Sequence, residues 1–173
     1  LPQVHIRSSG MPWDTGGFFD LYVYVSDVET VFEQLRERGW QGYTDPVNYT
    51  LQVFDITEAI ARGPNGEALV LMQRNAPPYD KVAAASESGM SWPFNTALMV
   101  SDYDANRHFF ENVLGWTVHL NGESLTPPPG LNPTAIPLNL ASTLPRRFAA
   151  YANSENDRNG SLQILKTEGL TGV

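Results

Sequence analysis

The chain has 173 residues, no cysteine, and a formal net charge of −8 with a sequence isoelectric point near 4.7. The length fits a single domain over residues 1–173, and the lack of cysteine excludes disulfides, thiolate catalysis and cysteine-ligated metal sites. The acidic balance argues against nucleic acid or anionic membranes as partners, because binding to them needs clustered lysine and arginine. It suits either a cationic ligand or ordinary solubility.

The first predicted element is a strand, Phe19–Val25, which is rich in β-branched and aromatic residues. Ser26 and Asp27 are competing N-caps for the helix that follows, and Gly39 ends that helix. Apolar residues recur in the helix at the spacing of one buried face, namely Val28, Val31, Phe32 and Leu35.

Three more strands are predicted before residue 75. Gly42–Val53 is loosely β-like, Ile56–Ala61 follows it, and the dipeptide Asn65-Gly66 favours a tight turn into Glu67–Gln73. Together with the first strand and helix they form a predicted βαβββ module over residues 18–74.

A second module of the same kind is predicted over residues 93–168, after a linker at 75–92 that is rich in Pro, Ala and Ser. Its helix, Tyr103–Leu114, is expected to bury Phe109, Phe110, Val113 and Leu114. Its strands are expected at Asn95–Val100, Trp116–Leu120, Arg147–Ala152 and Ser161–Lys166. An inserted Pro-rich loop at 126–137 is either a lid or partner-contacting arm, or a rigid surface loop.

The two modules repeat the same sequence pattern. Val-Ser-Asp at residue 25 recurs 75 positions later, and Gly-Trp at residue 39 recurs 76 positions later. Each module would cover one face of its sheet with its helix and leave the other face unburied. The sequence therefore predicts an α+β fold, in which two tandem βαβββ modules form curved sheets around a shared cavity.

No apolar run reaches the roughly 20 residues that a membrane span needs. Residues 1–17 lack both the basic start and the apolar stretch of a signal peptide. We therefore expect a cytoplasmic protein without a membrane partner.

The repeated segments and two motifs make the chain resemble the vicinal oxygen chelate superfamily, which includes glyoxalase I, bleomycin-resistance proteins and extradiol dioxygenases. FFENVLGW at 109–116 is similar to the end of the helix in modules of this family. GPNGEALVLM at 63–72 is similar to the turn and last strand of such a module. The resemblance implies the fold above, a cavity for a small organic molecule, and a homodimer.

In metal-dependent members of this family, the first and last strands of each module supply His, Gln or Glu ligands. The matching positions in the two first strands hold Asp20 and Asn95. In the last strand of the first module the position holds Leu69 or Val70, and in that of the second module it holds Gln163 or Ile164, depending on the alignment. The resemblance thus implies that the usual metal ligands are largely missing. We expect no cofactor, or at most a weakly held divalent ion on Asp20, Asn95 and Gln163.

Strand alternation places one set of side chains toward the expected cavity. The candidate ligand-binding residues are Tyr22, Tyr24, Asn95, Met99 and Gln163. Asp20 on the same face is a candidate general base if burial raises its pKa; alternatively, it only hydrogen-bonds Asn95 or a tyrosine hydroxyl.

Other polar residues are weaker candidates. His119 lies in a predicted strand and is the one histidine expected to reach the cavity, where it is a candidate catalytic residue. The pair Arg146-Arg147 is either a clamp for a carboxylate or a solvated edge.

Two functions remain open. The first is a metal-free cavity that binds a small organic molecule, aromatic or cationic, as in the bleomycin-resistance branch. The alternative is a divalent-metal-dependent lyase or dioxygenase of the same superfamily with a non-standard ligand set. Whether the protein is an enzyme is not decided by the sequence.

Overall fold

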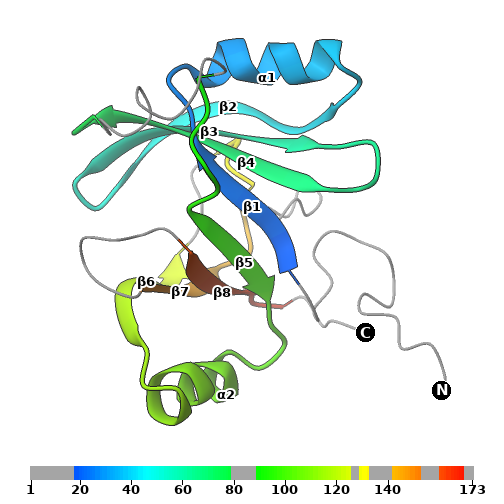
Figure 1. Ribbon diagram of the computed structural model, residues 1–173. Helices are drawn as coiled ribbons and strands as arrows, with labels where there is room; N and C mark the ends of the chain where they lie inside the picture. Colours follow the sequence, from blue (N-terminus) through cyan, green and yellow to red (C-terminus); the bar gives the residue numbers. More distant parts are fainter. Residues whose placement is uncertain (1–17, 79–88, 126–128, 133–141, 153–159, 170–173) are drawn as a thin grey trace, which may run out of the picture.

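The computed structural model describes residues 18–78, 89–125, 129–132, 142–152 and 160–169. They form one curved eight-stranded sheet in the order β2-β3-β4-β1-β5-β8-β7-β6, with a helix on the outer side of each half (Figure 1). The predicted α+β fold with two βαβββ modules is confirmed.

The first module contains β1 (Phe18–Tyr24), α1 (Val28–Glu37), β2 (Gln41–Leu51), β3 (Phe54–Arg62) and β4 (Ala68–Ala76). β4 runs two residues into the segment predicted as a linker. β1 and β4 pair in parallel, whereas β3 pairs antiparallel with both β2 and β4.

The helix α1 packs against the outer face of this half-sheet through the predicted apolar stripe. Val28, Val31 and Phe32 are buried, and they pack with β1 and β4 residues such as Val23 and Leu71. Of the two competing N-caps, Asp27 occupies the position, because its Oδ1 accepts a hydrogen bond of 2.9 Å from the amide of Thr30.

Replacing this cap tests the local account of α1. Asp27→Ala should lower the free energy of unfolding by about 1 kcal/mol, because the first helical turn then loses an acceptor. Asp27→Asn keeps an acceptor and should cost only a few tenths of a kcal/mol. Urea unfolding followed by circular dichroism measures both variants. Equal losses for Ala and Asn would mean that the hydrogen bond to Thr30 does not stabilise the helix.

The second module repeats the arrangement. Its elements are β5 (Asn95–Met99), α2 (Tyr103–His108) with a π-helical continuation (Phe109–Val113), β6 (Thr117–Leu125), β7 (Arg146–Ala152) and β8 (Ser161–Thr167). Here β5 and β8 pair in parallel, as β1 and β4 do in the first module.

The burial predicted for the second helix is wrong in part. Phe110 is buried and packs its ring 5.2 Å from that of Tyr151. Phe109, Val113 and Leu114 are instead 47%, 62% and 44% exposed. The helix widens to a π-turn over Phe109–Val113, where the amide of Leu114 bonds the carbonyl of Phe109. The wider turn changes the rotation per residue, so the α-helical spacing no longer predicts the buried face.

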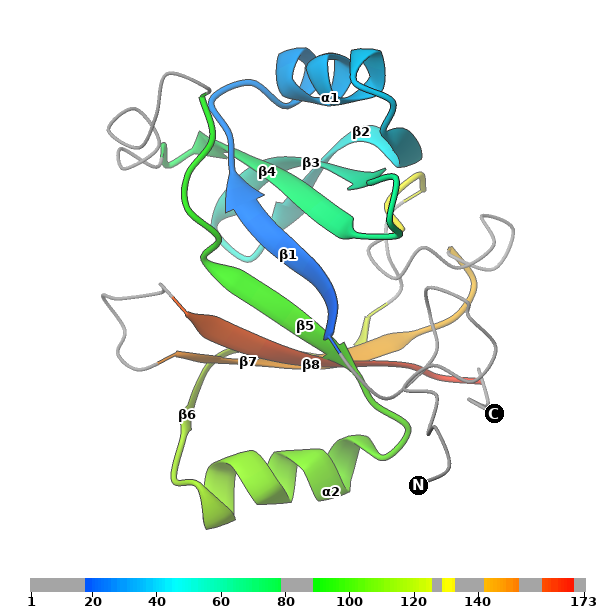
Figure 2. The same cartoon turned by 45° about the vertical axis from the view of Figure 1, so that its right-hand side comes forward.

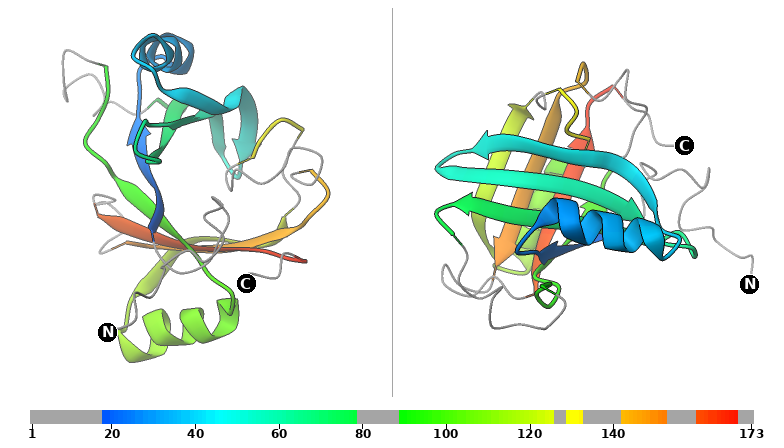
Figure 3. Two further views of the ribbon diagram at one scale, coloured as in Figure 1. Left: turned by 90° about the vertical axis from the view of Figure 1, so that its right-hand side faces the viewer. Right: turned by 90° about the horizontal axis from the view of Figure 1, so that it is seen from above.

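The two modules join where β1 and β5 pair antiparallel at the middle of the sheet. Figures 2 and 3 show α1 and α2 at opposite ends of the molecule, with the two halves of the sheet between them. The helices thus cover the outer faces, and the inner faces of the two half-sheets are turned toward each other.

Most of the predicted Pro-rich loop, 126–128 and 133–137, lies outside the described residues. The described part, residues 129–132, reaches across to the first module. Leu131 is buried, and Gly130 lies so close to β2 that a Cβ there would be 3.1 Å from Cγ2 of Val47. This short segment of the second module therefore contacts the first module.

Candidate functional site

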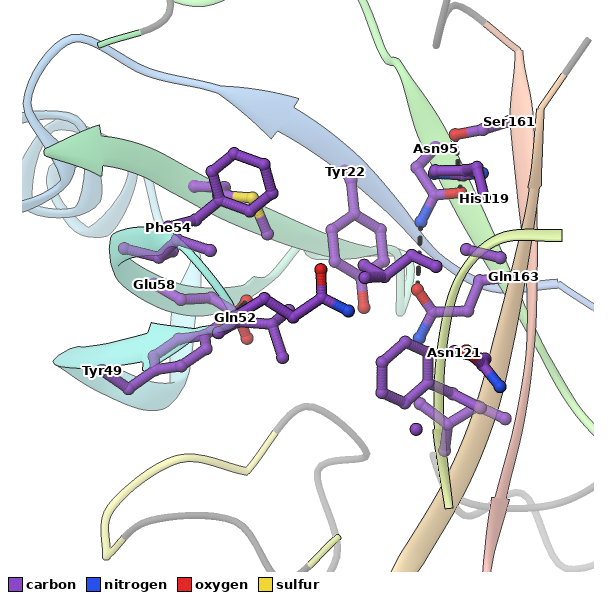
Figure 4. Close-up of a pocket in the computed structure, with 18 of the residues that line it drawn as sticks. Tyr22, Tyr49, Gln52, Phe54, Glu58, Asn95, His119, Asn121, Ser161 and Gln163 are labelled. Carbon is purple, nitrogen blue, oxygen red and sulfur yellow. Dashed lines mark hydrogen bonds between the residues drawn. The ribbon is translucent and has the colours of Figure 1, made fainter. Parts of the chain in front are cut away.

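A cavity of about 590 Å³ lies between the inner faces of the two modules, and Figure 4 shows part of its lining. Strands from both modules contribute side chains, and Leu131 adds an apolar wall from the inserted loop. The volume falls within the range typical of small-molecule sites.

Aromatic rings form much of the cavity wall. Tyr24 and Phe94 stack with ring centroids 3.9 Å apart, and Tyr22 meets Phe94 edge-on at 6.1 Å. The guanidinium of Arg74 stacks over Phe54, with its Cζ 3.8 Å from the ring centroid. Such walls favour a ligand with a flat apolar body, because stacked and edge-on contacts add to the burial of apolar surface.

Asn95 and Gln163, two predicted site residues, lie together in the cavity (Figure 4). Asn95 Nδ2 donates to Gln163 Oε1 at 3.4 Å, and Ser161 Oγ lies 2.9 Å from Asn95 Oδ1. The two amides are neighbours because β5 and β8 pair in parallel, with Asn95 opposite Ser161.

Asp20 is buried, but it is not among the residues that line the cavity. Its Oδ1 accepts a 3.0 Å hydrogen bond from the amide of Ala97 across the β1–β5 pair. The register of this pair shifts between Phe18 and Asp20. Of the two roles considered for Asp20, the geometry favours the hydrogen-bonded one, with a backbone partner instead of Asn95 or a tyrosine hydroxyl.

These residues do not fit a divalent ion. The Asp20 carboxylate serves a backbone amide, and the side-chain oxygens of Asn95 and Gln163 already have partners. The fourth position holds Leu69 or Val70, and neither side chain can bind a metal; Val70 is fully buried in a core cluster with Tyr22. Among the described residues, no three His, Asp or Glu side chains come together in a way that suits a metal.

The other predicted site residues divide between the cavity and the core. Tyr22, Tyr24 and His119 line the cavity, with His119 entering from β6 at a register shift between Val118 and Leu120. Met99 does not line it: this side chain packs in the core with Phe19 and Leu165.

Sequence reasoning missed Glu58, a carboxyl group in the middle of β3 that lines the cavity. It is only 4% exposed, and its Oε2 accepts a 2.8 Å hydrogen bond from the Tyr49 hydroxyl. Burial raises the pKa of Glu58 to about 7, although the Tyr49 hydrogen bond and the charge of Arg146 act to lower it. The sequence signal was present: Glu58 shares its strand face with Ile56 and Ile60.

The predicted pair Arg146-Arg147 splits between the two faces of β7. Arg147 points outward and forms ion pairs with Asp104 at 2.8 Å and Glu123 at 2.6 Å. Arg146 lines the cavity and is 8% exposed. Its guanidinium makes no hydrogen bond or ion pair with the described residues, and burial lowers its pKa.

No protein-family model matches the sequence, and no curated protein matches it either. Solved structures do match. Glyoxalase I from Zea mays is similar with a TM-score of 0.57 at 18% identity, over 90% of this chain and 44% of the maize chain. The chain thus spans less than half the length of that relative.

Two further structures are similar. Methylmalonyl-CoA epimerase from Mycobacterium tuberculosis has a TM-score of 0.53 at 14% identity over 87% of each chain. A mutant of 4-hydroxymandelate synthase from Streptomyces coelicolor has a TM-score of 0.54 at 11% identity, over 89% of this chain and 48% of the other. All three are members of one superfamily, so the chain has the fold of the vicinal oxygen chelate superfamily, as its sequence resemblance predicts.

Proposed function

We propose that the cavity binds a small organic molecule with a flat apolar body, without a divalent metal ion. The observation that carries the proposal is the cavity of about 590 Å³, walled by aromatic rings and supplied with a few polar groups from both modules. The side-chain oxygens of Asn95 and Gln163 already accept hydrogen bonds, and Asp20 lies outside the cavity lining, which supports binding that is independent of metal.

Filling the cavity should weaken binding. Ala150 is buried in β7 and lines the cavity, so Ala150→Phe places a ring where the ligand would lie. We expect about tenfold weaker binding of aromatic compounds that stabilise the wild-type protein in a thermal-shift screen. EDTA should leave the stabilisation unchanged.

The matched control is Ala152→Phe, on the same strand but outside the cavity lining. It should bind like wild type. Ala150→Leu serves as a milder substitution, and thermal unfolding without ligand shows whether each variant is folded. A folded Ala150→Phe protein with wild-type affinity would contradict binding in this cavity, as would stabilisation that EDTA abolishes.

Glu58 favours a second candidate function, an enzyme that transfers a proton to or from the bound molecule. A carboxyl group with a pKa of about 7 is partly ionised near neutral pH, which suits general acid–base catalysis. Hydrogen exchange of a bound organic molecule in D2O, followed by NMR, would test this candidate. Exchange that persists in Glu58→Gln would contradict it.

Further expectations concern a membrane span, the oligomeric state, the cellular location and metal dependence. Among the described residues, no helix is long and apolar enough to cross a membrane. The homodimer and the cytoplasmic location stay predictions. The alternative of a metal-dependent lyase or dioxygenase gains no support from the side chains at the four family positions.

A further inference from the structure

Glu58, Arg74, Glu123 and Arg146 line the cavity, and two of these four charged side chains, one from each module, are buried. Glu58 comes from β3 of the first module, and Arg146 comes from β7 of the second. Both are more than nine-tenths buried. They do not form an ion pair with each other, although each influences the pKa of the other through its charge.

Each of these two side chains has an atom without a partner. Glu58 Oε1 and Arg146 Nη1 are fully buried, and neither has a hydrogen-bond partner. Buried polar groups in proteins are almost always hydrogen-bonded, and a buried charge without a partner is costly. Because both side chains line the cavity, these two atoms point to a ligand that supplies the missing partners.

We propose that Arg146 binds the carboxylate of a small organic acid in this cavity, and that Glu58 Oε1 accepts a hydrogen bond from a hydroxyl or amino group of the same molecule. The inference rests on the proposed function and names the ligand class for that site.

The chemistry of the guanidinium favours a carboxylate. Its planar fork of N–H donors matches the two oxygens of a carboxylate, and charge-assisted hydrogen bonds of this kind are strong. Arg146 also disfavours the cationic ligand that the acidic composition suggested, because a second positive charge would be buried beside it. A dianionic phosphate fits less well, because the nearby Glu58 can itself carry a negative charge.

The rest of the cavity suits such an acid. The other arginine in the lining, Arg74, is stacked over Phe54. Tyr22 lies between Glu58 on one side and Asn95 with Gln163 on the other (Figure 4). An aromatic ring can therefore contact the apolar walls while its polar substituents reach Arg146 and Glu58.

Three matched probes test the inference: 3-hydroxybenzoate, its uncharged amide 3-hydroxybenzamide, and the cationic 3-hydroxybenzylamine. Isothermal titration calorimetry at pH 8 should give about tenfold or more tighter binding of the acid than of the amide, and weakest binding of the amine. Arg146→Met should remove the preference for the acid.

Arg147→Met is the matched control, because it removes the neighbouring positive charge from the outer face of the same strand. It should keep the preference for the acid. Arg146→Lys keeps a charge but loses the planar fork, so an intermediate preference is expected. Thermal unfolding of each variant shows whether it is folded.

The outcomes separate the two proposals. If wild type binds the acid and the amide equally, or if folded Arg146→Met keeps the preference for the acid, the inference is overturned while the proposed function stands. If wild type binds none of the three probes at millimolar concentration, both proposals are overturned.

Discussion

The free energy of unfolding of the wild-type protein, compared with that of Glu58→Gln, is expected to fall by about 3 kcal/mol as the pH rises from 4.5 to 8. Burial raises the pKa of Glu58 from 4.5 in the unfolded chain to about 7 in the fold. The folded protein therefore holds this proton more tightly than the unfolded chain does. The stabilisation is complete below pH 4.5 and is lost as the pH rises through 7.

Urea unfolding at several pH values measures this effect, and the difference between wild type and Glu58→Gln cancels the contributions of other groups. Glu33→Gln, a change at an exposed glutamate on α1, is the control and should follow the wild-type curve. A constant difference between wild type and Glu58→Gln across this pH range would show that the carboxyl is not buried as described.

Arg146→Met is expected to raise the free energy of unfolding by about 1–3 kcal/mol at pH 5. The guanidinium is buried without a partner in the absence of ligand, so an apolar side chain of similar length should be better tolerated there. Such a gain would come at the expense of ligand binding, as is common at functional sites.

The gain should depend on pH. At pH 5 Glu58 is protonated and uncharged, so it loses no favourable charge interaction when Arg146 is removed. At pH 8 Glu58 is ionised and loses a favourable charge, so the gain should be smaller. Arg147→Met loses only partly exposed ion pairs and should cost about 0–1 kcal/mol at either pH. A loss of stability in Arg146→Met at pH 5 would contradict an unpaired buried guanidinium.

The fold was predictable because its signals are local and occur twice. Short-range patterns predict the strand Phe19–Val25, the capped helix after Asp27 and the Asn65-Gly66 turn. The sequence repeat then predicts the same order of elements in the second module. The burial of the second helix was not predictable, because the π-turn at Phe109–Val113 changes the angular spacing without an obvious sequence signal.

The site was predictable only where strand alternation determines it. Tyr22, Asn95 and Gln163 lie in the cavity because they belong to the central strands that carry the repeat. The sequence suggests Arg146-Arg147 as a clamp for a carboxylate, but the placement of Arg146 and Glu58 in one cavity depends on how strands of two different modules curve toward each other. The sequence of either strand alone does not predict that curvature. The single charged residue among apolar residues on one face of β3, Glu58, does indicate a buried polar position.

A crystal structure of the protein with 3-hydroxybenzoate tests the central claim most directly. We predict the ring between the inner faces of the two modules, with a carboxylate oxygen within hydrogen-bond distance of the Arg146 guanidinium. The account would be contradicted if the protein's own side chains filled the cavity. It would also be contradicted if the acid bound elsewhere and Arg146 pointed to solvent.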